Sequence, residues 1–491
     1  MSDEERTRNM MDRMSTPHGN RLSPVKALIR STVPLVLGIG VLLPLGVSSC
    51  QATVQDWAVA EAESVGLDAG LIDALVEQLE AGSFRNLHSL LVVKGGRLVV
   101  EEYSGDLGAD DLHYTASVTK SVATLLLGMA MQRGLLPGLD DGVLDMPLSE
   151  LLPEYSQALS QNPGKAGMTL RHVLSMTGGL EWDEDSFPYD DPRNDWARVR
   201  DADDPLDVIF QQPMASEPGT HFVYSGGMST IVGYLLERAT DGQPRSFAEQ
   251  ELFEPLGITE YRWWDLEGGL LDAPGGLHLR PRDMAKIGQL MLHGGLWDGK
   301  RIVSDEWVTE TSRRHVENPG SPDYALQWWC GDFNYRARST YLYMASGHGG
   351  QKIFVVPDFD MVIVLTHQVF DNPFGELNNL SILSRYLLPA ADSTVPETVV
   401  LQLSAKVLSG YVGEYQGPQG SFHVEIADGN LRLSGEGSPP MIIEPVGEAR
   451  FRGYVEGLLE VYFEFDLDEQ GLAQSGRARF GFRNDVLERI R

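Results

Sequence analysis

An apolar run at residues 117–133 constrains this 491-residue chain more than any other segment. It opens with Ser117-Val118-Thr119-Lys120, and nearly all of the following residues are aliphatic. The pattern predicts a helix from Ser117 to about Arg133 without a polar face, ending at Gly134. Such a helix must be covered on all sides, so it requires a large core. The length allows that core together with an accessory domain.

The first turn of this helix carries a potential nucleophile and base. Ser117 and Lys120 are three residues apart and share a helix face. Burial beside apolar neighbours and the positive end of the helix dipole both lower the pKa of a lysine. Such an amine can take the proton of a hydroxyl and activate it. The S-x-x-K string alone is weak, because a second copy starts at Ser23, and a solvated lysine at a helix N-terminus is the alternative.

Two further segments carry polar groups beside glycines. Tyr224 precedes an apolar helix predicted from Met228, and a phenol near a lysine can relay a proton. The alternative is a core tyrosine whose hydroxyl is hydrogen-bonded. The segment 346–351, Ser-Gly-His-Gly-Gly-Gln, precedes a predicted strand, and its glycines allow a backbone to approach a substrate closely. The backbone N–H groups of Gln351 and Ser117 could then hold the oxyanion of a tetrahedral intermediate.

In their order and spacing, these three segments resemble the motifs of serine beta-lactamases, penicillin-binding proteins and class C-type esterases. The resemblance covers roughly residues 67–388. It implies that Ser117 is the acylated nucleophile, Lys120 the base or proton shuttle, and Tyr224 the group that protonates the leaving group. It also implies a set of oxyanion and substrate-lining residues, namely Gly226, His348, Gly349, Gly350 and Gln351.

The second and third motifs depart from the family pattern. Gly226 stands where the second motif usually ends in Asn, and His348-Gly349-Gly350 stands where K-T-G is usual. Both missing groups help to hold beta-lactams, so the departures argue against antibiotic hydrolysis. Tyr-Ser-Gly and Gly-His-Gly-Gly-Gln resemble the 6-aminohexanoate-dimer hydrolase branch. We therefore expect a serine hydrolase of small esters or amides. The alternatives are a D-alanyl-D-alanine peptidase or weak beta-lactamase of cell-wall metabolism, and a non-catalytic envelope lipoprotein that only binds.

The resemblance implies an α+β fold for residues 51–388, with an antiparallel sheet, helices on both faces and a helical lobe. Strands are predicted at 87–93 and 98–103, joined by a hairpin at Gly95-Gly96. A polar, Pro-containing linker follows at 389–397. Short alternating segments in 398–491 predict a small all-β barrel. Residues 410–415 resemble the start of a lipocalin-like module often appended to such hydrolases.

Residues 1–50 resemble a lipoprotein-type export signal. Basic residues precede an apolar stretch at 33–47, which ends at Val-Ser-Ser-Cys50. This resembles the bacterial lipobox, so Cys50 is the expected lipidation site and the lipid would anchor the protein in a membrane. Residue 51 is Gln and not Asp, which resembles lipoproteins sent to the outer membrane. We therefore expect the protein on the periplasmic side of the outer membrane. An uncleaved anchor helix is the alternative, and Met14 is a second possible start.

Composition excludes other classes of function. The net charge of −31 argues against nucleic-acid binding. The eleven histidines are scattered and no Gly-rich phosphate loop follows a strand, so we expect no metal or other cofactor. Cys50 and Cys330 allow no disulfide framework.

The segment 181–207 has eleven acidic residues and three arginines. As a loop or short helices over the site it would favour amine-bearing or uncharged substrates; the alternative is a solvated surface.

Overall fold

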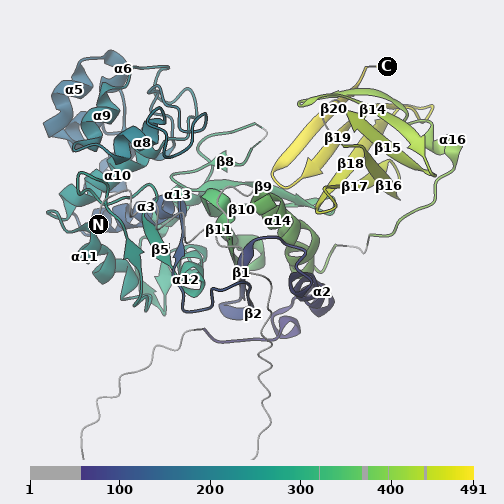
Figure 1. The fold of residues 1–491 in the computed structure, drawn as a ribbon, viewed down its shortest axis with the longest axis horizontal. Helices are drawn as coiled ribbons and strands as arrows, with labels where there is room; N and C mark the ends of the chain where they lie inside the picture. Colours follow the sequence, from purple (N-terminus) through teal and green to yellow (C-terminus); the bar gives the residue numbers. More distant parts are fainter. Residues whose placement is uncertain (1–56, 320, 368–373, 396–397, 436–438, 491) are drawn as a thin grey trace, which may run out of the picture.

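The computed structural model describes residues 57–319, 321–367, 374–395, 398–435 and 439–490 (Figure 1). Its centre is a seven-stranded sheet of order β2-β1-β12-β11-β10-β9-β8, in which all neighbours are antiparallel. The strands are β1 (Leu87–Lys94), β2 (Arg97–Tyr103), β8 (Asp323–Tyr324), β9 (Trp329–Tyr335), β10 (Arg338–Gly347), β11 (Gln351–Val356) and β12 (Met361–His367). β1 and β2 form the predicted hairpin. Gly95 and Gly96 have φ of 59° and 72°, as a type I′ turn requires.

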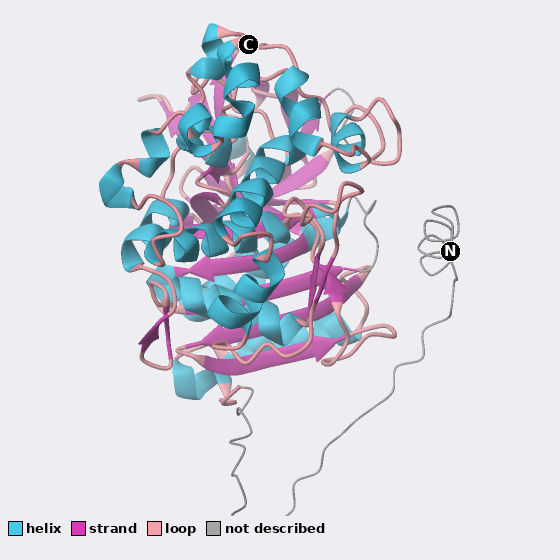
Figure 2. Ribbon diagram, turned by 90° about the vertical axis from the view of Figure 1, so that its left-hand side faces the viewer, coloured by secondary structure: helices cyan, strands magenta, loops and turns pink. Residues whose placement is uncertain are grey.

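Helices cover both faces of the sheet (Figure 2), and each face has its own apolar core. On one face lie α3 (Val118–Gln132) and α12 (Pro281–Leu292), and on the other α2 (Ala69–Glu80) and α14 (Phe374–Ile382). Alternation along the strands separates the cores. Val362 and Val364 of β12 lie in the core that contains α3 and α12, whereas Ile363 and Leu365 lie in the core on the opposite face. This arrangement confirms the α+β prediction.

α3 is the buried helix that the sequence predicts. Every residue from Val118 to Met131 is buried. The helix packs against β10, β11, α13 (Asp305–Ser312) and α10 (Gly226–Ala239). Gly128 allows a close contact with α13, because a Cβ there would lie 2.1 Å from a ring atom of Trp307. The complete burial fixes the first turn of α3, and hence Ser117 and Lys120, at the centre of the domain.

A helical lobe lies beside the sheet (Figure 1). The acidic segment 181–207 belongs to it and contains one short helix and the start of a second, which pack on each other. The short helices that the sequence allowed for this segment are therefore present in part of it. The lobe's helices are α4 (Leu148–Leu151), α5 (Ser156–Ser160), α6 (Pro163–Ala166), α7 (Leu170–Leu174), α8 (Asp195–Arg200), α9 (Pro205–Gln211), α10 and α11 (Pro244–Ala248). A small sheet links the lobe to α3 through β3 (His113–Tyr114), β4 (Arg262–Trp263) and β5 (Leu277–Leu279). A two-stranded sheet, β6 (Leu296–Trp297) and β7 (Lys300–Arg301), follows α12.

The C-terminal region forms a closed eight-stranded barrel, which confirms the predicted all-β module. Aromatic side chains fill its interior, and the rings of Tyr411, Phe451 and Phe465 contact one another. α15 (Leu388–Ala391) extends into the predicted linker, and α16 (Ala405–Leu408) precedes the barrel. The strands are β13 (Gly413–Gly417), β14 (Gly420–Ala427), β15 (Asn430–Gly435), β16 (Met441–Gly447), β17 (Arg450–Val455), β18 (Leu459–Leu467), β19 (Ala473–Phe480) and β20 (Arg483–Arg489).

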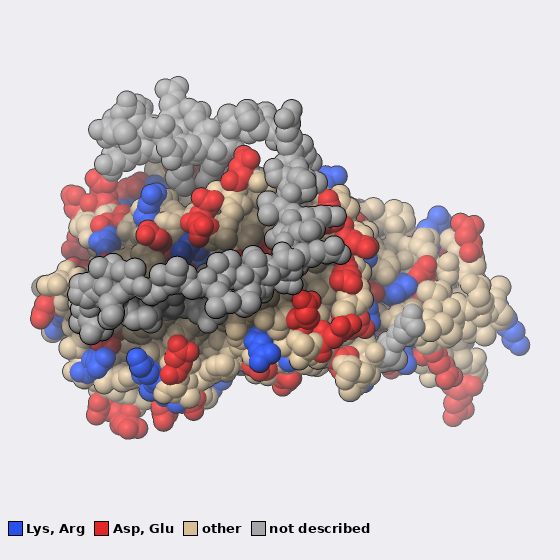
Figure 3. Space-filling view, turned by 90° about the horizontal axis from the view of Figure 1, so that it is seen from below, with Lys and Arg blue, Asp and Glu red and all other residues tan. Residues whose placement is uncertain are grey.

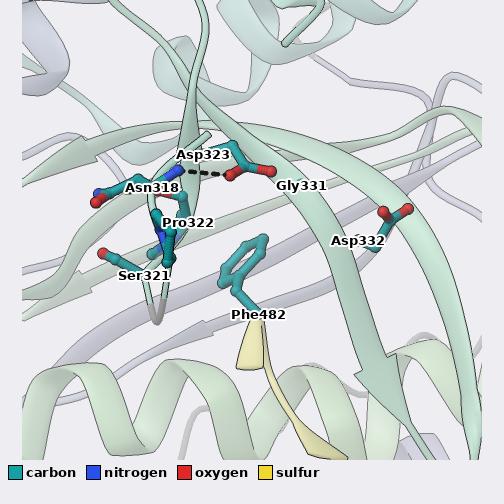
Figure 4. Close-up of a pocket in the computed structure, with 8 residues that line it drawn as sticks. Asn318, Ser321, Pro322, Asp323, Gly331, Asp332 and Phe482 are labelled. Carbon is teal, nitrogen blue, oxygen red and sulfur yellow. Dashed lines mark hydrogen bonds between the residues drawn. The ribbon is translucent and has the colours of Figure 1, made fainter. Parts of the chain in front are cut away.

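The barrel docks on β9 through the turn between β19 and β20. Asn334 donates side-chain hydrogen bonds to the carbonyls of Gly481 (2.8 Å) and Arg483 (3.1 Å). Phe482 meets Phe333 edge to face at 5.1 Å. Figure 4 shows Phe482 beside a hollow that it shares with residues 318, 319 and 321–323, near Gly331 and Asp332. This hollow contains none of the predicted catalytic residues.

Acidic side chains lie over both the larger domain and the barrel in Figure 3, interspersed with basic ones.

The predicted lipidation site, Cys50, lies outside the described residues. Within the described ranges, no helix combines the length and the apolar character that crossing a membrane would need. Cys330 is buried in β9, and burial raises the pKa of its thiol to about 11. Cys330 therefore has the character of a buried apolar residue.

Candidate active site

Ser117 directly precedes α3, at the end of a segment that β5 holds in place. The Thr115 hydroxyl donates to the Leu277 carbonyl at 2.8 Å, and the Leu277 N–H donates to the Thr119 hydroxyl at 3.2 Å. Between these anchors, Ala116 has φ of 48°, a left-handed conformation that is unusual for alanine. Ser117 itself is half-buried. The hydroxyl is therefore held by a fixed backbone and remains partly accessible.

The Lys120 amine lies 3.0 Å from the Ser117 hydroxyl oxygen. It also donates to the Pro274 carbonyl at 2.8 Å, and Lys120 is only 4% exposed. Burial lowers the pKa of Lys120 to about 8, although the charges of Glu184 and Asp272 act in the opposite direction. A substantial fraction of the amine is thus neutral near pH 8. It is placed to accept the Ser117 proton.

Tyr224 completes the group at the second motif. Lys120 Nζ lies 5.1 Å from the centre of its ring, and Ser117 is close enough to the Tyr224 hydroxyl to act on its pKa. The ring stacks on Trp329 of β9, with ring centres 5.6 Å apart. Burial, together with the nearby Glu184 charge, raises the pKa of Tyr224 above its usual value. The phenol therefore keeps its proton at neutral pH and can donate it.

Glu184 is a buried carboxylate that motif analysis did not single out. It is 5% exposed, and its Oε2 accepts hydrogen bonds of 2.7 Å from the Trp182 indole and from the Gly226 N–H. Burial raises its pKa. Its charge also acts on both Lys120 and Tyr224. The acidic composition of 181–207 was the available signal, but it could not distinguish this residue from its exposed neighbours.

The glycine at the end of the second motif has a steric cause. A Cβ on Gly226 would lie 2.7 Å from the Trp196 ring and 3.2 Å from the Glu184 carboxylate. A side chain such as the family's usual Asn therefore has no room here. Trp196 and Glu184 occupy the space beside the motif instead.

Asp272 is a second buried carboxylate near Lys120. It is 8% exposed and accepts a hydrogen bond of 2.9 Å from the Gly275 N–H, which stabilises the turn that presents the Pro274 carbonyl to Lys120. Burial raises the pKa of Asp272 to about 6. This turn was not among the sequence predictions. Its Asp-Ala-Pro-Gly-Gly composition is typical of a turn, but nothing in it shows that the turn lies beside Lys120.

The third motif meets the Ser117 segment at Gly347. A Cβ there would lie 2.2 Å from the Thr115 carbonyl oxygen, so only glycine allows the approach. His348 follows and is exposed, and its ring meets that of Tyr189 edge to face at 5.7 Å. Tyr189 comes from the acidic segment, which thus reaches the site.

The remaining motif residues form the turn into β11. Gly349 and Gly350 have φ of 79° and 96°. The Gln351 side chain is buried and hydrogen-bonds to the backbone of His367. Only the backbone of Gln351 is therefore left to serve the site. Gln351 opens β11 and is paired with Gly347 at the end of β10.

The structure thus brings Ser117, Lys120 and Tyr224 together where the helical lobe meets the sheet. Glu184 and Asp272 lie close enough to act electrostatically on Lys120. In the part of the chain that the structure describes, no three His, Cys, Asp or Glu side chains converge as metal ligands would.

Known proteins are similar to this chain in sequence and in fold. A family described as Beta-lactamase matches residues 72–386. Over 311 residues the chain is 27% identical to a 6-aminohexanoate-dimer hydrolase of Paenarthrobacter ureafaciens, covering 56% of this chain and 71% of the relative. Over 209 residues it is 27% identical to a lovastatin esterase of Penicillium rubens, covering 38% of this chain and 48% of that protein.

The structure of an octameric penicillin-binding protein homologue from Pyrococcus abyssi superposes with a TM-score of 0.51 and 18% identity. The match covers 86% of this chain and 100% of the other. The residues before the barrel make up less than 86% of this chain, so the match must include part of the barrel. The two proteins therefore share a fold that extends into the barrel. Together with the family match over most of the larger domain, this places the sequence motifs on the expected scaffold. The chain belongs to the beta-lactamase family.

Proposed function

We propose that this protein is a serine hydrolase that cleaves small esters or amides through an acyl-enzyme on Ser117. One observation carries the proposal. A buried amine whose pKa is lowered to about 8 lies 3.0 Å from a half-buried serine hydroxyl. The family and the hydrolase names of the two relatives support a serine hydrolase.

The first step forms the bond between Ser117 and the substrate. The Ser117 oxygen attacks the carbonyl carbon while its proton passes to the neutral Lys120 amine. The carbonyl becomes a tetrahedral oxyanion. The backbone N–H groups of Ser117 and Gln351 are the proposed donors to that oxyanion. Both segments meet at the contact between Gly347 and Thr115.

The next steps release the two products. Tyr224 donates its phenolic proton to the leaving alcohol or amine and regains a proton from the Lys120 ammonium. The bond to the leaving group breaks and the acyl group stays on Ser117. Water then attacks the acyl-enzyme and gives one proton to the Lys120–Tyr224 pair. The Ser117 oxygen takes a proton from this pair as its bond to the acyl carbon breaks. The carboxylic acid is released and the enzyme returns to its starting state.

The substrate class follows from the same site. Gly226 offers no side chain for a substrate amide, and Gly349 offers none in the third motif. These are the positions at which beta-lactam recognition would be expected. Small esters and amides are therefore preferred over beta-lactams, and the aminohexanoate dimer named for one relative is a reasonable amide to test. Hydrolysis of D-alanyl-D-alanine or of beta-lactams is the alternative.

A fluorophosphonate probe and a substrate panel test the proposal. The wild type should be labelled and Ser117→Ala should not. Ser409→Ala, at an exposed residue between α16 and the barrel, should behave as the wild type. p-Nitrophenyl esters should turn over faster than the aminohexanoate dimer or nitrocefin. Labelling that survives Ser117→Ala would refute the assigned nucleophile. Covalent binding of a fluorescent penicillin with fast nitrocefin turnover would favour the alternative, and no reaction at all would favour a binding lipoprotein.

We further propose an exported protein, anchored through a lipid on Cys50 at the periplasmic side of the outer membrane. The apolar stretch that ends at Cys50 supports this, and the acidic chain gives no reason to expect nucleic acid as a partner. The Cys50→Ala variant should no longer partition into the detergent phase or fractionate with membranes. Unchanged partitioning would contradict the anchor.

A further inference from the structure

We propose that His367 and Asn379 are positioning residues of the oxyanion site, which they serve by fixing the turn 347–350 from behind. The inference rests on the proposed function, because the turn matters only if Ser117 is acylated. It also adds to that function two residues that no motif contains. Both residues lie on the face of the sheet opposite to α3, so neither can touch the substrate from there.

The two side chains converge on one carbonyl. His367 Nδ1 lies 3.1 Å from the Gly350 oxygen, and Asn379 Nδ2 donates to the same oxygen at 3.0 Å. A carbonyl only accepts, so His367 must carry its proton on Nδ1. Burial lowers the pKa of His367 to about 4, which keeps the ring neutral at working pH. One carbonyl of the turn thus receives two donors from β12 and α14.

The turn is packed as well as hydrogen-bonded. A Cβ on Gly350 would lie 2.9 Å from His367 Nδ1, and a Cβ on Gly375 would lie 2.9 Å from the Gly349 carbonyl oxygen. The His367 ring and the start of α14 therefore rest directly on the turn. The Gln351 side chain adds two more bonds, donating to the His367 carbonyl at 3.0 Å and accepting from the His367 N–H at 3.3 Å. The turn is held on the side away from Ser117.

The opposite side of the turn meets the nucleophile segment at Gly347 and Thr115. A peptide group is planar, and its carbonyl and N–H point in opposite directions when it is trans. None of the described peptide bonds is cis. Anchoring the carbonyl of Gly350 therefore restricts how the peptide groups of the turn can rotate. Since an oxyanion donor is useful only at about 2.7–3.1 Å from the oxyanion, such restriction bears directly on catalysis.

Asn378 and Asn379 provide a matched pair of variants. They are neighbours in α14 and both are 0% exposed. Each donates to one backbone carbonyl, and neither Oδ1 has a hydrogen-bond partner among the described residues. Asn378 binds the carbonyl of Arg85, whereas Asn379 binds that of Gly350. Asn378→Leu and Asn379→Leu should therefore lower the melting temperature similarly, and only Asn379→Leu should impair catalysis.

His367 allows a test by rescue. Phe keeps the ring but removes the donor, whereas the amide of Asn can place an N–H near the position of Nδ1. We expect His367→Phe and Asn379→Leu to lower kcat on a p-nitrophenyl ester by about 10- to 100-fold, with KM changed less than threefold, since loss of a whole oxyanion donor costs about 10²–10³. His367→Asn should recover most of the rate. The affinity of phenylboronic acid, whose adduct with Ser117 is tetrahedral, should fall by the same factor as kcat.

The outcomes separate the two proposals. An active wild type labelled on Ser117, with His367→Phe and Asn379→Leu at normal kcat and normal boronate affinity, would overturn the positioning role alone. Equal losses of kcat in Asn378→Leu and Asn379→Leu would also overturn it, because the effect would then be one of general stability. A wild type that reacts with neither probe nor ester would refute the proposed function and this inference together.

Discussion

The carboxylate of Glu184 accepts a hydrogen bond of 2.7 Å from the backbone N–H of Gly226, at the end of the second motif. This contact places a buried negative charge beside the amine that is proposed to act as base. The charge raises the pKa of Lys120, whereas burial lowers it, and burial is the larger effect. The pH at which the enzyme becomes active is therefore set by a balance between the two.

The pH dependence of kcat/KM should report this balance. Only the neutral amine of Lys120 can accept the Ser117 proton, so the rate should rise with pH and level off above a midpoint near 8. The profile would be measured on an uncharged p-nitrophenyl ester, with its spontaneous hydrolysis subtracted at each pH. A rate that is flat between pH 6 and 10 would contradict the role of Lys120.

Glu184→Gln should move that midpoint to lower pH, because it removes the charge that favours the ammonium form. The amide oxygen of Gln can still accept from Trp182 and Gly226, so the fold should persist. Asp272→Asn removes the second charge and should move the midpoint in the same direction by less, since Glu184 has the larger effect on Lys120. A midpoint unchanged in Glu184→Gln would mean that Glu184 is protonated in the active enzyme.

Lys120→Ala should reduce acylation of Ser117 by about 10³-fold or more, as happens when one member of a catalytic unit is removed. The readout is the rate of fluorophosphonate labelling, with circular dichroism to check folding, because Lys120 also holds the Pro274 carbonyl. Near-normal labelling would exclude Lys120 as the base. Added primary amines that restore part of the rate would support it.

Some of these features could be predicted from sequence because they are local. The apolar run specified α3, and the spacing of Ser117 and Lys120 within one turn specified their contact. The two glycines after β1 specified the hairpin. In each case, residues a few positions apart determine the geometry.

The remaining parts of the site depend on contacts between distant segments. Glu184 and Gly226 are 42 residues apart, and Lys120 and Pro274 are 154 apart. A segment with eleven acidic residues among other residue types gives no sign of which carboxylate is buried. The motif also suggested Gln351 as a site residue but not that its side chain turns toward His367. Chain folding decides these points, and no local pattern encodes them.

Gly347→Ala should damage both stability and activity. A Cβ at this position would lie 2.2 Å from a backbone oxygen, which cannot move aside as a flexible side chain could. Overpacking of this kind costs about 1–3 kcal/mol, and separating the third motif from Ser117 by about 1 Å could cost about 10²-fold in rate. Gly108→Ala is the control, because the nearest atom to its Cβ would be 3.9 Å away. Equal activity of the two variants would show that the contact at Gly347 is not needed.

The acidic segment leads to a prediction about substrate charge. Asp185 is exposed, and its charge acts on Glu184 and on Tyr224. A negative field at the site should favour esters with an amine over matched esters with a carboxylate. The preference should shrink in 1 M salt, where the screening length falls from about 10 Å at 0.1 M to about 3 Å.

Asp185→Asn distinguishes a local field from the overall charge of the protein. It should reduce the ratio of kcat/KM for the cationic ester to that for the anionic ester, because the lost charge lies beside the site. Glu469→Gln, an exposed residue in the barrel, removes the same charge at a distance and should leave the ratio unchanged. If both variants reduce the ratio equally, net charge is responsible. If the wild type shows no preference at low salt, the acidic segment is simply a solvated surface.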